Sequence, residues 1–281
     1  MPKIIRIATR KSPLALWQAE KVRELIQNID NSIEIELIKI TTTGDKIQDK
    51  PLYEVGGKSL FLKELEQALL ENDCDIAVHS MKDMPAELHE DLVISAILER
   101  EDDRDVLISN KYNSLAEFTT DSSIGTSSVR RICNLKYEYP NIKISDMRGN
   151  IDTRINKIVN NEIEGIILAA AGVKRLGLKK YITAYMDKNT WVPAIGQGAI
   201  GIETRKNNKE VNSLINKLDH KLTSLCVSAE REISKFFEAS CSMPIAANAT
   251  IVNNSISISS MVGSLDGSKK IYHIENGSVK E

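Results

Sequence analysis

Short apolar runs of strand length alternate with amphipathic segments along the first third of the chain. Residues 4–8, 33–40 and 76–78 have the pattern of strands. A serine and a proline at Ser12 and Pro13 mark the start of a helix after the first of them. That helix carries apolar residues at helical spacing, namely Leu14, Trp17, Val22, Leu25, Ile26 and Ile29. A second helix is predicted around residues 62–69, and the alternation as a whole predicts a mostly parallel sheet.

The same alternation returns in the middle of the chain. Strands are predicted at 142–146 and 166–171, and helices begin near Val129 and Ile151. Seven successive charged residues, 99–105, separate the two patterns, and we interpret this run as a linker. Residues 191–199 are rich in glycine and proline and predict a second linker.

Beyond the second linker the pattern changes. A strand at 200–203 returns toward the first unit, and helices are predicted over 210–218 and 223–237. Strands at 245–251, 255–261 and 270–274 then indicate an antiparallel meander. The polar stretch 41–45, in the first unit, is predicted to be a loop. The expected domains are residues 1–98 with 197–218, residues 104–192, and residues 219–281.

Composition and charge exclude several classes of protein. The 281 residues are 42% hydrophobic, and 37 Lys and Arg face 39 Asp and Glu, for a formal net charge of −2. This balance predicts a globular protein and disfavours a general nucleic-acid binder. No stretch approaches the ~20 apolar residues of a membrane span, and the N-terminus has no export signal. We therefore expect a cytoplasmic protein without a membrane partner.

The first candidate site lies at residues 75–85, where an apolar run stops at polar and ionisable side chains. Pro85 pushes the preceding residue toward extended geometry, so His79, Ser80, Lys82 and Asp83 are expected at or just beyond the strand's carboxyl end. Open α/β sheets bind their ligands at that edge. The alternative is that Lys82 and Asp83 form an exposed loop pair of little consequence.

Several arginines stand at or near predicted helix starts. Arg10, Arg130, Arg131 and Arg154 all occupy such places, although the helix dipole disfavours cations there by ~0.3–1 kcal/mol each. An anionic ligand would resolve the conflict, because free N–H groups and guanidinium groups would then bind the same carboxylates or phosphates. The alternative is that each arginine pairs with a structural Asp or Glu.

One of the four cysteines differs from the others. Cys74, Cys133 and Cys226 lie within apolar patterns and are expected to be small buried hydrophobes. Cys241 follows a predicted helix and precedes a proline by three residues, so it is expected in a loop. The wide spacing of all four indicates neither a disulfide framework nor a metal site.

These features occur within motifs that closely resemble the porphobilinogen deaminase (hydroxymethylbilane synthase) family. The resemblance extends over nearly the whole chain, in the family's order. It rests on RIATRKSPLALWQA at 6–19, VGGKSLF at 55–61, DIAVHSMKDMP at 75–85, GTSSVRR at 125–131, RGN at 148–150, PAIGQG at 193–198 and the loop around Cys241. It implies two periplasmic-binding-protein-like α/β domains joined by two crossings, with a small α+β C-terminal domain that bears the cofactor.

The resemblance also implies a reaction. Members of the family condense four porphobilinogen molecules head to tail, with loss of ammonia, into the linear tetrapyrrole hydroxymethylbilane. The growing chain is built on a dipyrromethane cofactor, which is itself two linked porphobilinogen units bound through a thioether, here to Cys241. The implied partner is the small-molecule substrate porphobilinogen. The protein is expected to be a monomer and to bind no nucleic acid.

Matching positions carry the family's site residues to this sequence. Asp83 is implied as the catalytic carboxylate. The implied cofactor-binding residues are Cys241, Lys82, Ser80, Thr126, Ser127, Ser128, Arg130 and Arg131. The implied substrate-binding residues are Arg10, Gln18, Lys58, Arg148, Arg154 and Gln197.

The sequence departs from the family in two places. Ala239 and Ser240 precede Cys241 where the family often has two small residues of the glycine type, and the chain ends at Glu281 without the apolar helical segment that usually completes the third domain. We therefore expect a shortened third domain. An inactive homologue and an anion-binding protein are the alternatives, but an anion-binding protein would give no role to Cys241.

Overall fold

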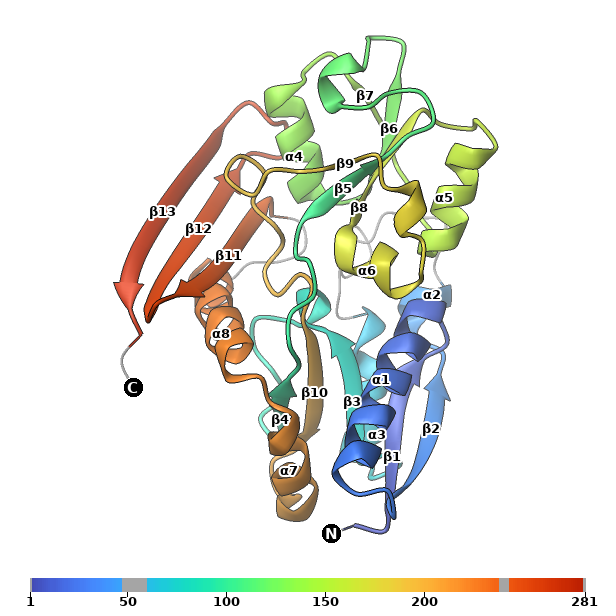
Figure 1. The fold of residues 1–281 in the computed structure, drawn as a ribbon, viewed down its shortest axis with the longest axis vertical. Helices are drawn as coiled ribbons and strands as arrows, with labels where there is room; N and C mark the ends of the chain where they lie inside the picture. The colour runs from blue at the N-terminus through green and yellow to red at the C-terminus, as the bar shows by residue number, and fades with distance from the viewer. Residues whose placement is uncertain (1, 47–59, 238–242, 280–281) are drawn as a thin grey trace.

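The computed structural model describes residues 2–46, 60–237 and 243–279 and contains three sheets (Figure 1). The first is five-stranded, in the order β2-β1-β3-β10-β4. Its strands are β1 (Ile4–Arg10), β2 (Glu34–Ile40), β3 (Ile76–Ser80), β4 (Leu92–Ile97) and β10 (Ile200–Arg205). The expected strands of the first unit are all present in this sheet.

The first sheet is mostly parallel, as predicted, but one of its strands runs in the opposite direction. Strand β1 pairs in parallel with β2 and β3, but β10 inserts between β3 and β4 and is antiparallel to both. Parallel neighbours need a crossover connection that returns the chain to the same end of the sheet. Strand β10 instead arrives from the other half of the molecule, so it enters the sheet from the opposite end.

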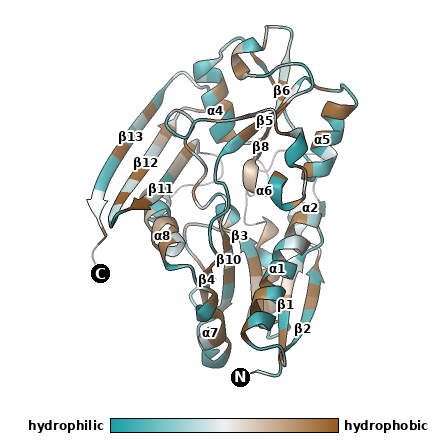
Figure 2. Cartoon of the chain, viewed as in Figure 1, coloured by the Kyte–Doolittle hydropathy of each residue, from teal (hydrophilic) through white to brown (hydrophobic). Residues whose placement is uncertain are grey.

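Helices cover both faces of this sheet. On one face α1 (Pro13–Ile29) buries Val22 and Ile26, and its N-cap Ser12 accepts a hydrogen bond from the Ala15 amide at 3.4 Å. On the other face α3 (Lys63–Leu70) buries Leu65 and Leu69. Helix α7 (Lys209–Ile215) packs on the same side as α1. In Figure 2 hydrophobic (brown) and hydrophilic (teal) residues alternate along α1 and α7.

The predicted loop at 41–45 contains a short helix, α2 (Thr43–Lys46). Thr42 and Asp45 explain it, because each side chain bonds the other residue's backbone amide at 3.2–3.3 Å. This reciprocal pattern is that of a capping box, which satisfies the first free N–H groups of a helix.

The second sheet has the order β7-β6-β8-β5-β9. Its strands are β5 (Asp105–Ile108), β6 (Ser123–Gly125), β7 (Lys143–Ser145), β8 (Gly165–Ala169) and β9 (Ala184–Tyr185). It is flanked by α4 (Val129–Glu138), α5 (Ile151–Val159) and α6 (Ala170–Arg175). The strand predicted to reach residue 171 therefore ends two residues earlier, because the apolar run continues without a break into a buried helix.

The third sheet confirms the predicted antiparallel meander. Strands β11 (Ile245–Val252), β12 (Ser255–Gly263) and β13 (Lys270–Ser278) pair in sequence order. Helix α8 (Lys221–Phe236) packs against β11. The fold class is therefore confirmed as two α/β units with a small α+β unit. Short 3-10 helices complete the described chain, namely η3 (Met81–Asp83), η4 (Leu115–Glu117), η5 (Lys179–Tyr181) and η6 (Asn216–Leu218).

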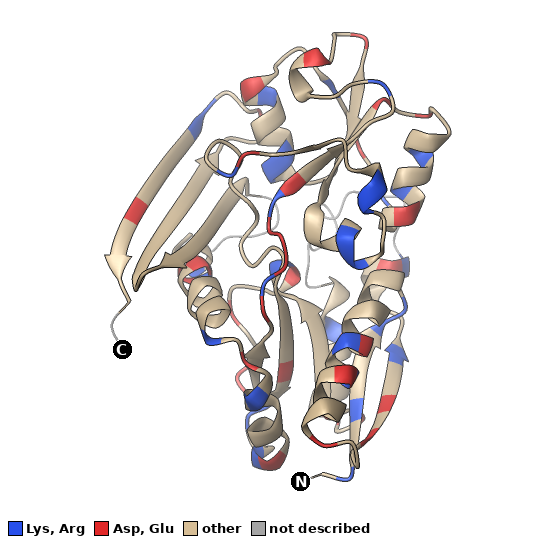
Figure 3. Cartoon of the chain, viewed as in Figure 1, with Lys and Arg blue, Asp and Glu red and all other residues tan. Residues whose placement is uncertain are grey.

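Two segments cross between the α/β units, one from β4 to β5 and one from β9 to β10. The first contains the charged run, visible as alternating red and blue at the centre of Figure 3. It is a connection, as predicted, but it is tightly bonded: Asp103 is 7% exposed and Asp105 is fully buried. Asp102 accepts hydrogen bonds from Arg104 and, at 2.7 Å, from Lys174 of α6.

Across the described residues, the helices are too short or too polar to cross a membrane.

Candidate active site

A cleft of about 510 Å³ lies between the two α/β units. Both units and the second crossing contribute to its walls. The predicted site residues among its lining are Arg10, Gln18, Ser80, Lys82, Asp83, Ser127, Arg131, Arg148, Arg154 and Gln197. Positions that are up to 187 residues apart in the sequence are thus brought together at one place.

Asp83 stands on a tight turn at the carboxyl end of β3, as the sequence predicted. The chain passes from Ser80 into η3 (Met81–Asp83), which we call the Asp83 turn, and Met84 before Pro85 is extended. The Met81 amide donates to the Ala199 carbonyl at 3.0 Å, and the side chains of Met81 and Met84 are buried. Buried methionines therefore anchor the turn, while the half-buried Lys82 and Asp83 line the cleft.

Gln18 orients Ser80 beside this turn. Gln18 is 3% exposed, and its side-chain amide donates to Ser80 Oγ at 2.8 Å. Because Gln18 comes from α1 and Ser80 from β3, the bond joins two elements at the cleft. Ser80 Oγ keeps its own O–H to donate.

Arg10 lines the cleft and is also paired with a structural carboxylate. It forms an ion pair with Asp45, with Arg10 Nε 3.3 Å from Asp45 Oδ2. Its guanidinium lies 4.0 Å from the centre of the Phe61 ring. Burial tends to raise the pKa of Asp45, but the hydrogen bond and charge of Arg10 outweigh it, and the pKa is lowered. Arg10 therefore has a structural acidic partner, as the alternative interpretation predicted.

Arg130 and Arg131 converge on one buried carboxylate, Asp105. Arg130 Nη2 and Arg131 Nη2 each lie 2.7 Å from an Asp105 oxygen. Further donors go to backbone carbonyls, from Arg130 to Val192 and from Arg131 to Ile167, both at 2.8 Å. The structural-partner alternative thus holds here as well. Their roles as cofactor ligands stay predictions.

The predicted cofactor ligands divide by their position relative to the cleft. Among the residues that the structure describes, the lining includes Ser127 and Arg131 but does not include Thr126, Ser128 or Arg130. Thr126 is 1% exposed and Arg130 is 4% exposed. Ser127 Oγ donates to the Met147 carbonyl at 2.6 Å. Arg131 is therefore the better placed of the two neighbouring arginines to reach a ligand in the cleft.

The wall of the cleft that the second α/β unit contributes has a concentration of positive charge. Burial lowers the pKa of Arg154 to about 10, and the charges of Arg131 and Arg148 add to this effect. Burial also lowers the pKa of Arg175 to about 10. A lowered arginine pKa means that the protonated form is insufficiently stabilised. Carboxylate or phosphate groups of a ligand would supply the missing stabilisation.

Arg175 was not among the predicted site residues. It comes from α6, lines the cleft, and donates to the Gly198 carbonyl of the second crossing at 2.7 Å. The sequence did contain a signal, because the basic pair Lys174 and Arg175 follows soon after a buried strand. The intervening helix was not predicted, so the direction of Arg175 could not be.

Lys58 and Cys241 lie outside the described residues. In the chain Cys241 follows α8, which ends at Phe236, and precedes β11, which begins at Ile245. The other cysteines are buried as predicted. Burial raises the pKa of the Cys74 thiol to about 12 and also raises those of Cys133 and Cys226. These three thiols are therefore poor nucleophiles at neutral pH.

Comparison with known proteins gives matches to two family models that together span most of the chain. Residues 5–213 match the one described as "Porphobilinogen deaminase, dipyromethane cofactor binding domain". Residues 224–281 match the one described as "Porphobilinogen deaminase, C-terminal domain". The first match alone exceeds half of the chain.

Solved structures similar to this chain include bacterial binding proteins and domains. The methionine binding protein MetQ is 15% identical, with 85% of this chain and 96% of that chain covered and a TM-score of 0.49. The BvgS VFT2 domain of Bordetella pertussis is 14% identical, with 83% and 93% covered and a TM-score of 0.48. The aliphatic sulphonate binding protein SsuA from Escherichia coli is 12% identical, with 85% and 71% covered and a TM-score of 0.46. No functional conclusion follows from likeness at this level.

Proposed function

Because the chain belongs to the porphobilinogen deaminase family, whose members are transferases of tetrapyrrole synthesis, we propose that it condenses four porphobilinogen molecules head to tail into hydroxymethylbilane. One observation supports this most directly. The half-buried Asp83 and the arginines Arg131, Arg148 and Arg154 line one cleft between the two α/β units.

The charge of the cleft fits the substrate and the cofactor. Porphobilinogen is a single pyrrole that carries an acetate and a propionate. A dipyrromethane made from two such units therefore presents four carboxylates. Half-buried arginines with lowered pKa values, Arg154 and Arg175, are suited to bind such groups. In this proposal Lys82, Ser80, Ser127 and Arg131 hold the dipyrromethane that Cys241 carries. When bound, this group supplies the free pyrrole α-carbon on which the product is built.

Asp83 performs the electrostatic part of the reaction. When the aminomethyl group of porphobilinogen loses ammonia, its C–N bond breaks and positive charge develops on the pyrrole nitrogen. A fixed carboxylate beside that N–H stabilises the charge, and does so strongly in a partly dry cleft. The Asp83 turn provides the fixed position, because Met81 and Met84 anchor it on either side.

The organisation of the chain enters the same proposal. We propose domains of residues 1–98 with 197–218, residues 104–192 and residues 219–281, with the reaction in the cleft between the first two. We also propose that the protein acts as a monomer.

The decisive experiment is the intact mass of the active protein, measured after denaturation in excess reductant. We expect one adduct of the size of two linked pyrrole units, located on Cys241 by peptide mapping. A thioether survives thiol reductants, unlike a disulfide. Cys74, Cys133 and Cys226 should remain free thiols. An active protein with the bare sequence mass, or with the adduct on another cysteine, would contradict the proposal.

A Cys241→Ser variant extends this test. It should lack the adduct, be inactive and unfold at a lower temperature, because a ligand that binds only the folded state stabilises that state. Cys133→Ser is the matched control, since it removes a buried thiol, and it should retain the adduct. An unloaded protein that binds porphobilinogen without consuming it would instead favour an anion-binding protein.

Replacing Arg10 by Leu should separate loading from elongation. Arg10 lines the same cleft as Lys82 and Asp83, and we assign it to the incoming substrate. The variant should therefore carry the adduct but consume porphobilinogen at least tenfold more slowly, with the loss measured as turnover of loaded protein. Arg23→Leu is the control, because Arg23 lies on α1 in an exposed pair with Glu20. A folded, loaded and fully active Arg10→Leu protein would exclude Arg10 from the site.

A further inference from the structure

The second crossing lies directly against the Asp83 turn. Gly196 has φ +68°, and a Cβ atom there would be 2.8 Å from Met81 Cβ, 2.9 Å from the Met81 carbonyl carbon and 3.1 Å from the Lys82 amide nitrogen. Contacts this short leave no room for any side chain. Three residues later, Ala199 accepts the Met81 amide hydrogen bond at 3.0 Å. The position of residues 196–199 therefore determines where the Asp83 turn sits.

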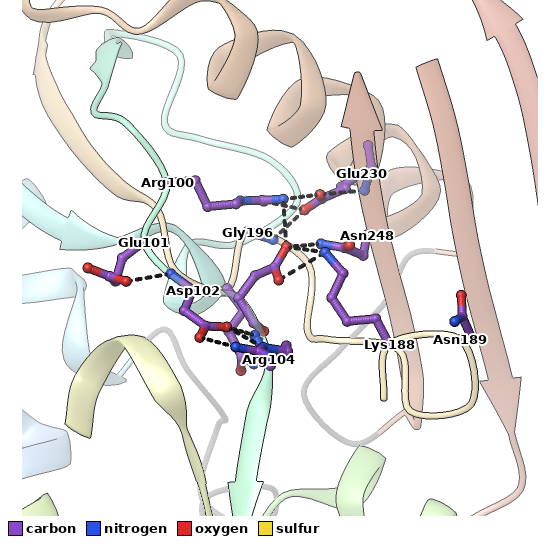
Figure 4. Close-up of polar contacts among 12 residues, drawn as sticks. Arg100, Glu101, Asp102, Arg104, Lys188, Asn189, Gly196, Glu230 and Asn248 are labelled. Atoms are coloured by element: carbon purple, nitrogen blue, oxygen red, sulfur yellow. Dashed lines mark hydrogen bonds and ion pairs between the residues drawn. The ribbon is translucent and has the colours of Figure 1, made fainter. Parts of the chain in front are cut away.

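A buried carboxylate from α8 holds this crossing in place. Glu230 is fully buried, and its Oε2 accepts from the Gly196 amide at 2.7 Å and from Arg100 Nη2 at 2.8 Å. Its Oε1 accepts from Arg100 Nη1 at 2.7 Å and from the Ala249 amide at 2.8 Å. Figure 4 shows Glu230 opposite Arg100, with Gly196 beside them. Four donors from three different segments thus meet on one carboxylate.

We propose that Glu230 is a positioning residue for the reaction. By holding Gly196, it keeps the second crossing against Met81 and Lys82 and so fixes Asp83 in the cleft. This inference rests on the proposed function, because that function gives Asp83 its role. Misplacing a reacting group by about 1 Å can cost on the order of 10²-fold in rate, so a contact distant from the chemistry can control turnover.

The same anchor links Asp83 to the third domain. Glu230 lies on α8, and the chain continues from α8 into the segment that contains Cys241. Ala249, which also donates to Glu230, lies on β11 immediately after that segment. Of the two elements that flank the cofactor cysteine, α8 therefore carries the carboxylate that holds Gly196, and β11 donates a hydrogen bond to it. The third domain and the crossing that packs against the Asp83 turn are therefore held by the same carboxylate, that of Glu230.

A neighbouring contact provides the comparison that separates positioning from simple stabilisation. Asn248 of β11 donates to Asp103 Oδ2 at 2.7 Å, and Lys188 lies 2.9 Å from the same oxygen (Figure 4). The Asn248 bond joins the third sheet to the first crossing, and the Lys188 pair joins the two crossings, whereas Glu230 binds Gly196 of the second crossing. Loss of the Asn248 bond should weaken the fold without moving the Asp83 turn.

The first experiment compares Gly196→Ala with Gly177→Ala. Both glycines have positive φ, +68° and +71°, but a Cβ at Gly177 would meet nothing within 4 Å. The two variants therefore share the backbone cost of the substitution, and only Gly196→Ala pushes on Met81 and Lys82. We expect Gly196→Ala to be loaded and to lose at least tenfold in kcat with KM nearly unchanged, whereas Gly177→Ala should keep the kcat of the wild type.

The second experiment compares Glu230→Gln with Asn248→Ala. An amide at position 230 places an NH₂ group against N–H donors whichever way it turns. The variant therefore loses either the bonds from Gly196 and Arg100 Nη2 or the bonds from Arg100 Nη1 and Ala249. We expect faster hydrogen exchange in the peptide that covers residues 79–85, together with lower kcat. Asn248→Ala should reduce thermal stability but leave exchange in that peptide and kcat unchanged. The exchange readout does not depend on catalysis.

The outcomes separate this inference from the proposed function. If the wild type carries no adduct and consumes no porphobilinogen, the proposed function fails, but the exchange comparison still decides whether Glu230 holds the Asp83 turn. If the wild type is active, and Gly196→Ala and Glu230→Gln match their controls in kcat and exchange, the inference is wrong. Failure of both variants to fold, with both controls folded, would also overturn it, since the contacts would then serve folding alone.

Discussion

Replacing Asp83 by Asn should reduce the turnover of porphobilinogen by ~10²-fold or more while leaving the fold and the adduct on the protein intact. The substitution keeps the shape of the side chain and removes its charge. Single preorganised electrostatic groups contribute about this much to rate in other enzymes. Because Asp83 is half-buried in a cleft lined with arginines, water compensates poorly for the loss of its negative charge. The measurement is kcat of loaded protein.

Two further variants make the Asp83 test specific. Asp83→Glu keeps the charge and moves it by one methylene, so it should retain more activity than Asp83→Asn. Asp91→Asn removes an exposed carboxylate of the same α/β unit, whose side chain is 71% exposed, and it should be as active as the wild type. Near wild-type turnover by Asp83→Asn would show that this carboxylate does not stabilise the developing charge.

The location of Asp83 could be predicted from the sequence because its causes are local. Pro85 restricts Met84, and the buried apolar run before Ser80 identifies the strand whose end reaches the cleft. The arginine prediction was also based on local reasoning, and it was incomplete for that reason. Helix starts at Val129 and Ile151 were correctly placed, but the partner of Arg130 and Arg131 lies 25 and 26 residues earlier, in the charged run.

The direction of β10 and the burial of the charged run depend on contacts that sequence patterns do not contain. A run of seven charges is usually solvated, whereas here Asp102, Asp103 and Asp105 find partners on α4, α6, β11 and the second crossing. Each of those partners is distant in sequence. The apolar pattern predicted the strands of the first and third sheets and most of the helices, but it did not predict β5, β6, β9 or α6. Tertiary pairing decided how the crossings are joined.

Asp105 was not predicted to matter, and its replacement by Asn should have the largest effect on stability. The carboxylate is fully buried and accepts from Arg130, Arg131, Trp191 and Gln197. Removing one partner of a buried ion pair typically costs ~3–5 kcal/mol, because the remaining charge is left uncompensated. Here two guanidinium groups would lose their counter-charge. We expect a loss of that size in the free energy of unfolding in urea at pH 7.

The pH dependence of unfolding provides an independent check on Asp105. Burial favours the neutral carboxyl and tends to raise its pKa, but the charges and hydrogen bonds of Arg130 and Arg131 outweigh this and hold the pKa far below its usual range. A carboxyl with a lowered pKa stabilises the fold above its unfolded pKa of about 4, and this contribution is lost as the pH falls below that value. The wild type should therefore lose stability steeply below about pH 4, and Asp105→Asn should lose less over the same range. Asp121→Asn, with a side chain 96% exposed, should follow the wild type. Equal stability of Asp105→Asn and wild type at pH 7 would mean that Arg130 and Arg131 do not need this carboxylate.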